Sequence, residues 1–150
     1  MNIVILGCGR VGSTLARMMY RDGHNVTVVD LQREAFRRLG TKFKGNRITG
    51  NGIDEDVLRR AGIDQAQVFV SATQGDNRNI MAAQIAKHVF NVPTVIARIY
   101  DPVRADRYRQ LGIVTLCTTT IASGLLRDFI NTEEWGLAKD YATDYVKMNV

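Results

Sequence analysis

The feature that most constrains this chain is a glycine-rich turn directly after its first apolar segment. Ile3-Val4-Ile5-Leu6 is a continuous apolar run, which is typical of a strand buried on both faces. Gly7, Gly9 and Gly12 follow it with the spacing G-x-G-x-x-G, as a helix is expected to begin. This order of strand, glycine turn and helix predicts a βαβ unit whose turn binds phosphate.

The residues of this turn have separate physical roles. Gly7 permits the tight turn, Gly9 lets a pyrophosphate approach the backbone, and Gly12 lets the helix pack against the strand. The free N–H groups at the helix start, where Arg10 and Val11 lie, attract an anion. The Arg10 guanidinium can also reach phosphates, although a solvated loop arginine is the alternative.

A second apolar strand, residues 25–30, ends in an acid. Asp30 stands 18 residues after Gly12, where a carboxylate can hold both hydroxyls of an adenosine ribose. The same carboxylate would repel a 2′-phosphate, so we expect it to select against one. Arg33 is close enough in the sequence to supply a charge that would rescue 2′-phosphate binding. The two strand ends together predict a nucleotide site.

Strands and helices alternate along the chain, and this alternation predicts the fold. Strands are expected at 2–7, 25–30, 47–50, 67–72, 94–99 and 113–117, and helices at 11–22, 32–40, 54–62, 76–90 and 102–111. Two βαβαβ halves indicate an α/β, Rossmann-like, doubly wound parallel sheet in the order 3-2-1-4-5-6. Its ligand crevice would lie beyond the carboxyl ends of strands one and four.

Polar residues at the ends of the fourth and fifth strands fall beside the same crevice. Arg98 ends an interior strand, where an unpaired charge is costly to bury, so a ligand phosphate or an internal acid must compensate it. Asp76 is expected to cap the next helix, with Asn79 in its first turn. Ser71, Thr73 and Asn79 can also line the ligand site.

Length and composition limit the remaining possibilities. The 150 residues fit one domain, and no apolar run approaches the ~20 residues that cross a bilayer, so a soluble cytoplasmic protein is expected. The net charge of +5 does not favour nucleic acid, because the basic residues are dispersed along predicted helices. Cys8 and Cys117 have no metal or redox spacing, so we expect each to be a small buried residue.

Groups that could catalyse a reaction are few. The sequence has no Tyr-x-x-x-Lys pair and no Gly-x-x-x-x-Gly-Lys-[Ser/Thr] loop, and His88 stands alone on a predicted helix. The absence of these groups favours a protein that binds a nucleotide without reacting with it. Such a protein would not be an enzyme, and its conformation would follow nucleotide occupancy. The alternative is a small NAD-dependent oxidoreductase that needs a partner or a missing domain.

A further helix is expected after the last strand. Its apolar stripe consists of Ile121, Leu125, Leu126, Phe129 and Ile130, and Trp135, Leu137, Tyr141 and Tyr145 follow it. We expect residues 1–118 to form the nucleotide-binding domain and 119–150 a helical dimerisation segment. The stripe either packs on the sheet of its own chain or docks on another subunit.

Several of these motifs together resemble the RCK family, the regulators of potassium conductance, and especially the nucleotide-binding subunits of bacterial potassium-uptake systems. The resemblance covers about residues 2–130. It rests on the glycine turn 5–12, Val29-Asp30, Thr49-Gly50-Asn51-Gly52 before residues 57–63, Ala72-Thr73-x-x-Asp76-x-x-Asn79, and Val95-Ile96-Ala97-Arg98.

This resemblance implies a function and partners. It implies that AMP, ADP, ATP or NAD(H) binds the site, with Asn51 and Gly52 on the adenine side, where family members often have Asp-Ala. It also implies a homodimer that assembles into larger rings. The ring would be peripheral to the inner face of the plasma membrane, through an integral-membrane potassium channel or transporter. The second, smaller domain that often follows is missing, which implies a fragment or a shorter family member.

Overall fold

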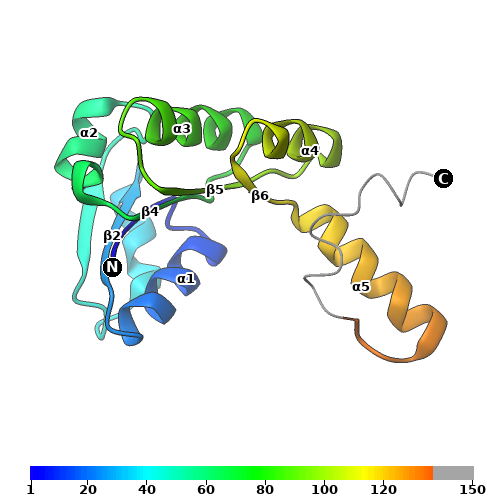
Figure 1. Cartoon of the computed structure of the whole chain (residues 1–150). Helices are drawn as coiled ribbons and strands as arrows, with labels where there is room; N and C mark the ends of the chain where they lie inside the picture. The colour runs from blue at the N-terminus through cyan, green and yellow to red at the C-terminus, as the bar shows by residue number, and fades with distance from the viewer. Residues whose placement is uncertain (137–150) are drawn as a thin grey trace.

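The computed structural model describes residues 1–136 and is built on a six-stranded sheet (Figure 1). The strands are β1 (Asn2–Leu6), β2 (Asn25–Asp30), β3 (Asn46–Thr49), β4 (Val68–Ser71), β5 (Thr94–Arg98) and β6 (Val114–Leu116). All pairs are parallel, and the order is β3-β2-β1-β4-β5-β6, so the predicted doubly wound topology is confirmed. The change of direction lies between β1 and β4.

Helices cover both faces of the sheet (Figure 1). They are α1 (Arg10–Arg21), the 3-10 helix η1 (Arg33–Leu39), α2 (Glu55–Arg60), the 3-10 turn η2 (Ile63–Gln65), α3 (Asp76–His88), α4 (Pro102–Gln110) and α5 (Thr118–Thr132). α2, α3 and α4 pack on one face, and α1 and η1 pack on the other. Each βα turn therefore opens at the carboxyl edge of the sheet.

The central strand β1 shows why this sequence forms a two-sided sheet. Its alternate residues point to opposite cores: Val4 and Leu6 pack with the α2–α4 side, and Ile3 and Ile5 pack with the α1–η1 side. All four are at most 3% exposed. A strand buried on both faces needs an uninterrupted apolar run, and the run at residues 3–6 meets this need.

Two elements differ from the sequence prediction. The helix expected at 32–40 is the 3-10 helix η1, which has no side-chain cap and ends at Gly40 in a positive-φ conformation. Such short 3-10 segments commonly serve as connectors. The short turn η2 was not predicted, because its three residues carry no periodicity.

Asp76 does not cap α3, so that prediction was wrong. Gly75 is the N-cap and makes no side-chain cap hydrogen bond. The Asp76 carboxylate instead accepts hydrogen bonds from the backbone N–H groups of Tyr100 and Asp101, at 2.8 and 3.0 Å. It therefore fixes the loop between β5 and α4, a tertiary contact that no local pattern signals.

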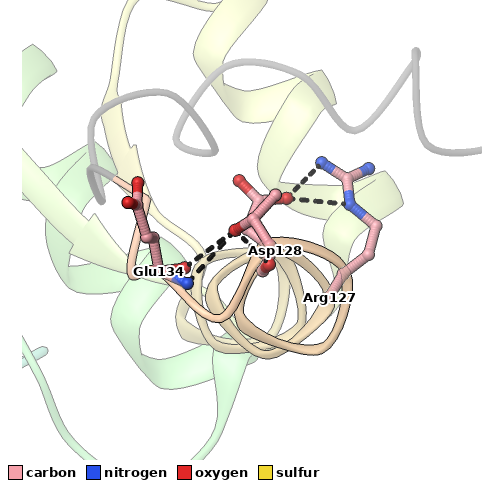
Figure 2. Close-up of polar contacts among 4 residues, drawn as sticks. Arg127, Asp128 and Glu134 are labelled. Atoms are coloured by element: carbon pink, nitrogen blue, oxygen red, sulfur yellow. Dashed lines mark hydrogen bonds and ion pairs between the residues drawn. The ribbon is translucent and has the colours of Figure 1, made fainter.

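α5 leaves the sheet after β6 and extends away from it (Figure 1). At its end, Thr132 Oγ1 donates to the Asp128 carbonyl and accepts from Glu134 N–H, while Arg127 pairs with the Asp128 carboxylate (Figure 2). The apolar stripe is open to solvent at Leu126, Phe129 and Ile130. Leu137, Tyr141 and Tyr145 lie outside the described residues.

Two further sequence expectations concern burial and membrane insertion. Cys8 and Cys117 are both free and buried, as predicted. Among the described residues, none of the helices combines the length and the apolar character needed to cross a bilayer.

Candidate functional site

A cleft of about 650 Å³ opens at the carboxyl edge of the sheet, beside the point where the strand order changes direction. Five segments line it: the β1–α1 turn, the end of β2 with one side of η1, the β3–α2 turn, the β4–α3 turn with the first turn of α3, and the end of β5. Of the predicted site residues, Gly7, Gly9, Arg10, Val11, Asp30, Asn51, Gly52, Thr73 and Arg98 line this cleft. Gly12 and Asn79 lie behind it.

The glycine turn has the geometry that the motif predicts. Gly7 has φ +101°, and a Cβ on Gly12 would stand 1.9 Å from the Gly7 carbonyl oxygen, so neither position accepts another residue without rearrangement. A Cβ on Gly9 would meet no atom within 4 Å. Gly9 is also the N-cap of α1 and provides no side-chain cap, which leaves the first N–H groups of the helix open to a ligand.

Asp30 is held rigidly beside this turn. Its Oδ2 accepts a hydrogen bond from Cys8 N–H at 2.6 Å, and its Oδ1 accepts one from Gln32 N–H at 2.8 Å. Each carboxylate oxygen retains a further lone pair that can accept a ligand hydroxyl. The acid therefore both tethers the turn to β2 and presents two acceptors at the cleft.

Arg98 lies at the opposite wall. Its Nη2 donates to the Thr73 carbonyl at 2.7 Å, and its guanidinium carbon lies 4.6 Å from the centre of the Tyr100 ring. Within residues 1–136 its Nε is buried and has no hydrogen-bond partner. No acid is present among the described contacts of Arg98, so its guanidinium is held by the Thr73 carbonyl and the Tyr100 ring.

Asn79 is fully buried, and all of its side-chain hydrogen bonds stay within the protein. Its Oδ1 accepts from Thr73 N–H and Thr73 Oγ1, and its Nδ2 donates to the carbonyls of Thr73 and Arg98. Ser71 Oγ donates to the Asn79 carbonyl and is likewise buried. Asn79 therefore shapes the cleft wall by joining the ends of β4 and β5, rather than by facing the cleft.

Asn51 and Gly52 form the wall beyond β3. Asn51 Oδ1 accepts from Ile53 N–H at 3.3 Å, which closes a tight turn before α2. A Cβ on Gly52 would stand 2.1 Å from Leu6 Cδ1, so alanine at this position would require the Leu6 side chain to move. The glycine thus lets the β3–α2 turn close onto β1.

Arg38, Arg78 and Tyr100 are among the cleft residues that the sequence prediction missed. Gln32, Ala35 and Arg38 are spaced by three residues, which a 3-10 helix places on one face, so the helix type brings Arg38 into the cleft. Arg78 belongs to the first turn of α3, which opens onto the carboxyl edge.

The cleft is strongly electropositive. Its lining includes four arginines, Arg10, Arg38, Arg78 and Arg98, and one acid, Asp30. Burial, and then the negative charge of Asp30, raise the pKa of the Cys8 thiol to about 11. The thiol is therefore protonated at neutral pH and adds no negative charge to the cleft. The four arginines suit a multiply charged anion, and Asp30 suits hydroxyl donors on the same ligand.

The sequence profile of the TrkA-N domain family matches residues 3–119, which include β1 from Ile3 onward, the other five strands and all of this cleft. The chain belongs to the TrkA-N domain family. A relative is the Trk system potassium uptake protein TrkA of Streptomyces coelicolor, which is 53% identical over 118 residues. The match covers 79% of this chain and 53% of that protein, so the chain spans about half the length of this relative.

Solved structures share the TrkA-N fold at low sequence identity. The Kef C-terminal domain of Shewanella denitrificans, solved with AMP, has a TM-score of 0.75 and 18% identity, over 99% of this chain and 93% of that domain. The channel GsuK bound to ADP has a TM-score of 0.74 and 22% identity, over 89% of this chain and 34% of that one. GsuK contains an RCK domain, and GsuK was also solved with NAD. The predicted kinship with the nucleotide-binding subunits of bacterial potassium-uptake systems is confirmed by the family match and the TrkA relative.

Proposed function

We propose that this chain is the nucleotide-binding regulatory domain of a potassium-uptake system, and that an adenine nucleotide or NAD(H) occupies the cleft. The observation that carries the proposal is the hydrogen bond between Cys8 N–H and Asp30 Oδ2. It fixes the phosphate-binding turn and the ribose-binding carboxylate side by side, so that one ligand can reach both. The family and the nucleotides held by the Kef domain and GsuK support this assignment.

The cleft suggests how such a ligand would lie. A pyrophosphate would accept hydrogen bonds from the open N–H groups of Arg10 and Val11, and the ribose hydroxyls would donate to Asp30. The adenine would then lie near Asn51 and Gly52. The outer phosphate of ADP or ATP, or the second nucleoside of NAD, would extend toward Arg98.

The output that we propose is a conformational signal rather than a chemical product. The Cys8 thiol is protonated near neutral pH and His88 ends α3, so neither supplies a nucleophile or a base to a bound nucleotide. Residues 1–118 would bind nucleotide, and residues 119–150 would dimerise. Dimers would assemble into rings on the cytoplasmic side of an integral-membrane potassium transporter, whose state would follow nucleotide occupancy.

Calorimetric titration of the purified chain with AMP, ADP, ATP, NAD⁺ and NADH tests the binding step. At least one of these should bind and raise the thermal midpoint, because a ligand at ~100 times its dissociation constant adds about 2.7 kcal/mol to the free energy of unfolding. Ribose 5-phosphate is the matched control without adenine. Absence of binding by all five nucleotides would refute the proposal.

The oxidoreductase alternative is tested in the same preparation. NADH absorbance is followed in the presence of a panel of small aldehydes and ketones. We expect NADH to remain reduced while it stays bound. Steady oxidation that depends on the carbonyl compound and on the protein would favour the enzyme instead.

A further inference from the structure

A second basic groove lies outside the nucleotide cleft, on the other side of η1. It has a volume of about 560 Å³ and is lined by Arg33, Glu34, Phe36 and Arg37 of η1 and by Arg47 and Thr49 of β3. None of these residues lines the cleft, to which η1 contributes Ala35 and Arg38 and its N-cap contributes Gln32. Arg33, which the sequence places close enough to supply a charge beside a 2′-phosphate, lines this groove and not the cleft.

Arg33 and Arg37 are exposed and unpaired. Within residues 1–136, neither guanidinium takes part in a hydrogen bond or an ion pair, although Glu34 lines the same groove. Arg59 on α2, by contrast, contacts both Glu55 and Asp56 of its own helix. Three like charges held around one groove repel each other, and a bound anion would remove that repulsion.

Arg47 gives the groove a fixed donor. Its Nη1 donates to the Gly45 carbonyl at 3.3 Å, its Nη2 donates to the Phe43 carbonyl at 2.7 Å, and its guanidinium stacks 5.2 Å from the centre of the buried Phe43 ring. These contacts hold the planar group in place and leave its other N–H donors for a ligand. A donor that is already ordered loses little entropy on binding, and guanidinium groups match phosphate oxygens.

The geometry points to a second anion site in this groove, which binds a phosphate-bearing ligand through Arg33, Arg37 and Arg47. The Thr49 hydroxyl adds a neutral donor, and the half-buried Phe36 ring supplies an apolar wall. The phosphate belongs either to a soluble phosphate compound or to an anionic lipid headgroup. The site is independent of the nucleotide cleft, because η1 separates the two.

The soluble source is tested by nuclear magnetic resonance titration with inorganic pyrophosphate. Saturable shifts are expected at Arg33, Arg37, Arg47 and Thr49, scored separately from shifts in the glycine turn 7–12. Arg33→Glu/Arg37→Glu should weaken the groove response by about tenfold or more, because each charged contact contributes at least that factor. The matched control is Arg17→Glu/Arg21→Glu on α1, which has the same residue spacing and charge change, and it should bind as the wild type does.

The lipid source is tested by co-sedimentation with phosphatidylcholine vesicles that contain or lack phosphatidylglycerol. Vesicle binding that needs phosphatidylglycerol and is lost only in the groove variant identifies a headgroup site, and a pyrophosphate response without vesicle binding identifies a soluble ligand. No response to either probe overturns the inference, as does an equal loss in the α1 control. If the double variant does not fold, Arg37→Gln is titrated against Arg17→Gln with the same outcomes.

Discussion

The backbone N–H of Cys8 donates a hydrogen bond of 2.6 Å to Oδ2 of Asp30, which joins the turn after β1 to the end of β2. The partner oxygen of the same carboxylate receives Gln32 N–H, so the acid also anchors the start of η1. Asp30 is thus a structural link before any ligand arrives, and its orientation at the cleft is set in advance. Preorganisation of this kind lowers the entropy that a ligand must lose.

Discrimination between NADH and NADPH should depend on Asp30. A 2′-phosphate would face the carboxylate, and like charges about 4 Å apart near a surface repel by ~1 to 4 kcal/mol. We expect NADH to bind about tenfold more tightly than NADPH, and Asp30→Ala to abolish that ratio, because the charges that remain in the cleft lining, Arg38 among them, are positive. Arg33→Ala should leave the ratio unchanged, since Arg33 lies in the outer groove. Competition titration decides this, and a wild-type preference for NADPH would contradict it.

Arg98 should matter more to binding than to folding. Arg98→Ala removes one hydrogen bond to Thr73 and the stack on Tyr100, but it also removes a buried donor without a partner. We expect affinity for the preferred nucleotide to fall by about ten- to a hundredfold, while the free energy of unfolding changes by ~1 kcal/mol or less. Calorimetry and urea unfolding of the same variant measure both. Unchanged affinity would make Arg98 a structural residue.

Asn79 and its neighbour Arg78 should behave in opposite ways. Asn79→Ala leaves Thr73 N–H and the Arg98 carbonyl without their buried partner, so we expect about 2 to 4 kcal/mol of lost stability. Arg78→Ala removes an exposed charge from the cleft and should reduce nucleotide affinity with little effect on stability. Urea unfolding and calorimetry on both variants test the contrast. Equal losses of stability would show that the first turn of α3 acts as one unit.

The pH dependence of stability should reveal the buried Cys8 thiol. Its pKa is 9.0 as an ordinary thiol and about 11 in the folded chain, because burial and Asp30 disfavour the thiolate. As pH rises from 9.0 to about 11, the unfolded chain loses this proton while the folded chain keeps it, so the free energy of unfolding falls. The full effect is on the order of 2 to 3 kcal/mol.

Cys8→Ala provides the comparison, because it removes the titrating group from a fully buried position. Urea unfolding of both proteins below pH 9.0 and near pH 11 should show wild type losing stability relative to the variant as pH rises. A difference that stays constant between these pH values would mean that the thiol titrates normally in the folded chain.

The sheet and half of the cleft could be predicted from the sequence because their signals are local. The apolar run 3–6, the glycine turn and Asp30 each lie within one βα unit, and alternation of strands and helices then fixes the strand order. The wall formed by β4 and β5 was less predictable. Asp76 bonds Tyr100 N–H and Asn79 bonds the Arg98 carbonyl, and both contacts join residues about twenty positions apart.

The roles of Arg33 and Arg38 show a second limit. Both are basic residues in one short segment, yet Arg38 lines the cleft and Arg33 lines the outer groove. Helix propensities barely distinguish α from 3-10 geometry in a seven-residue element, in which Leu39 is buried and Phe36 packs against the same core. Side-chain direction in such connectors therefore needs the structure.

The last prediction concerns α5, whose apolar stripe extends away from the sheet of its own chain. Ile130 is 78% exposed and Leu126 56%, while Phe129 stacks on Trp135 with ring centres 4.5 Å apart. Burial of such side chains contributes about 1.5 to 3 kcal/mol each, and a two-fold dimer needs only one self-complementary patch.

We therefore expect a wild-type dimer in light scattering, and Ile130→Asp should dissociate it without lowering the thermal midpoint of the domain. Phe129→Asp should dissociate it as well, with an added loss of the Trp135 contact. Asn131→Asp places the same charge across the helix from the stripe and should stay dimeric. A wild type that is monomeric at high concentration, or an Ile130→Asp variant that stays dimeric, would show that the signal leaves the domain by another surface.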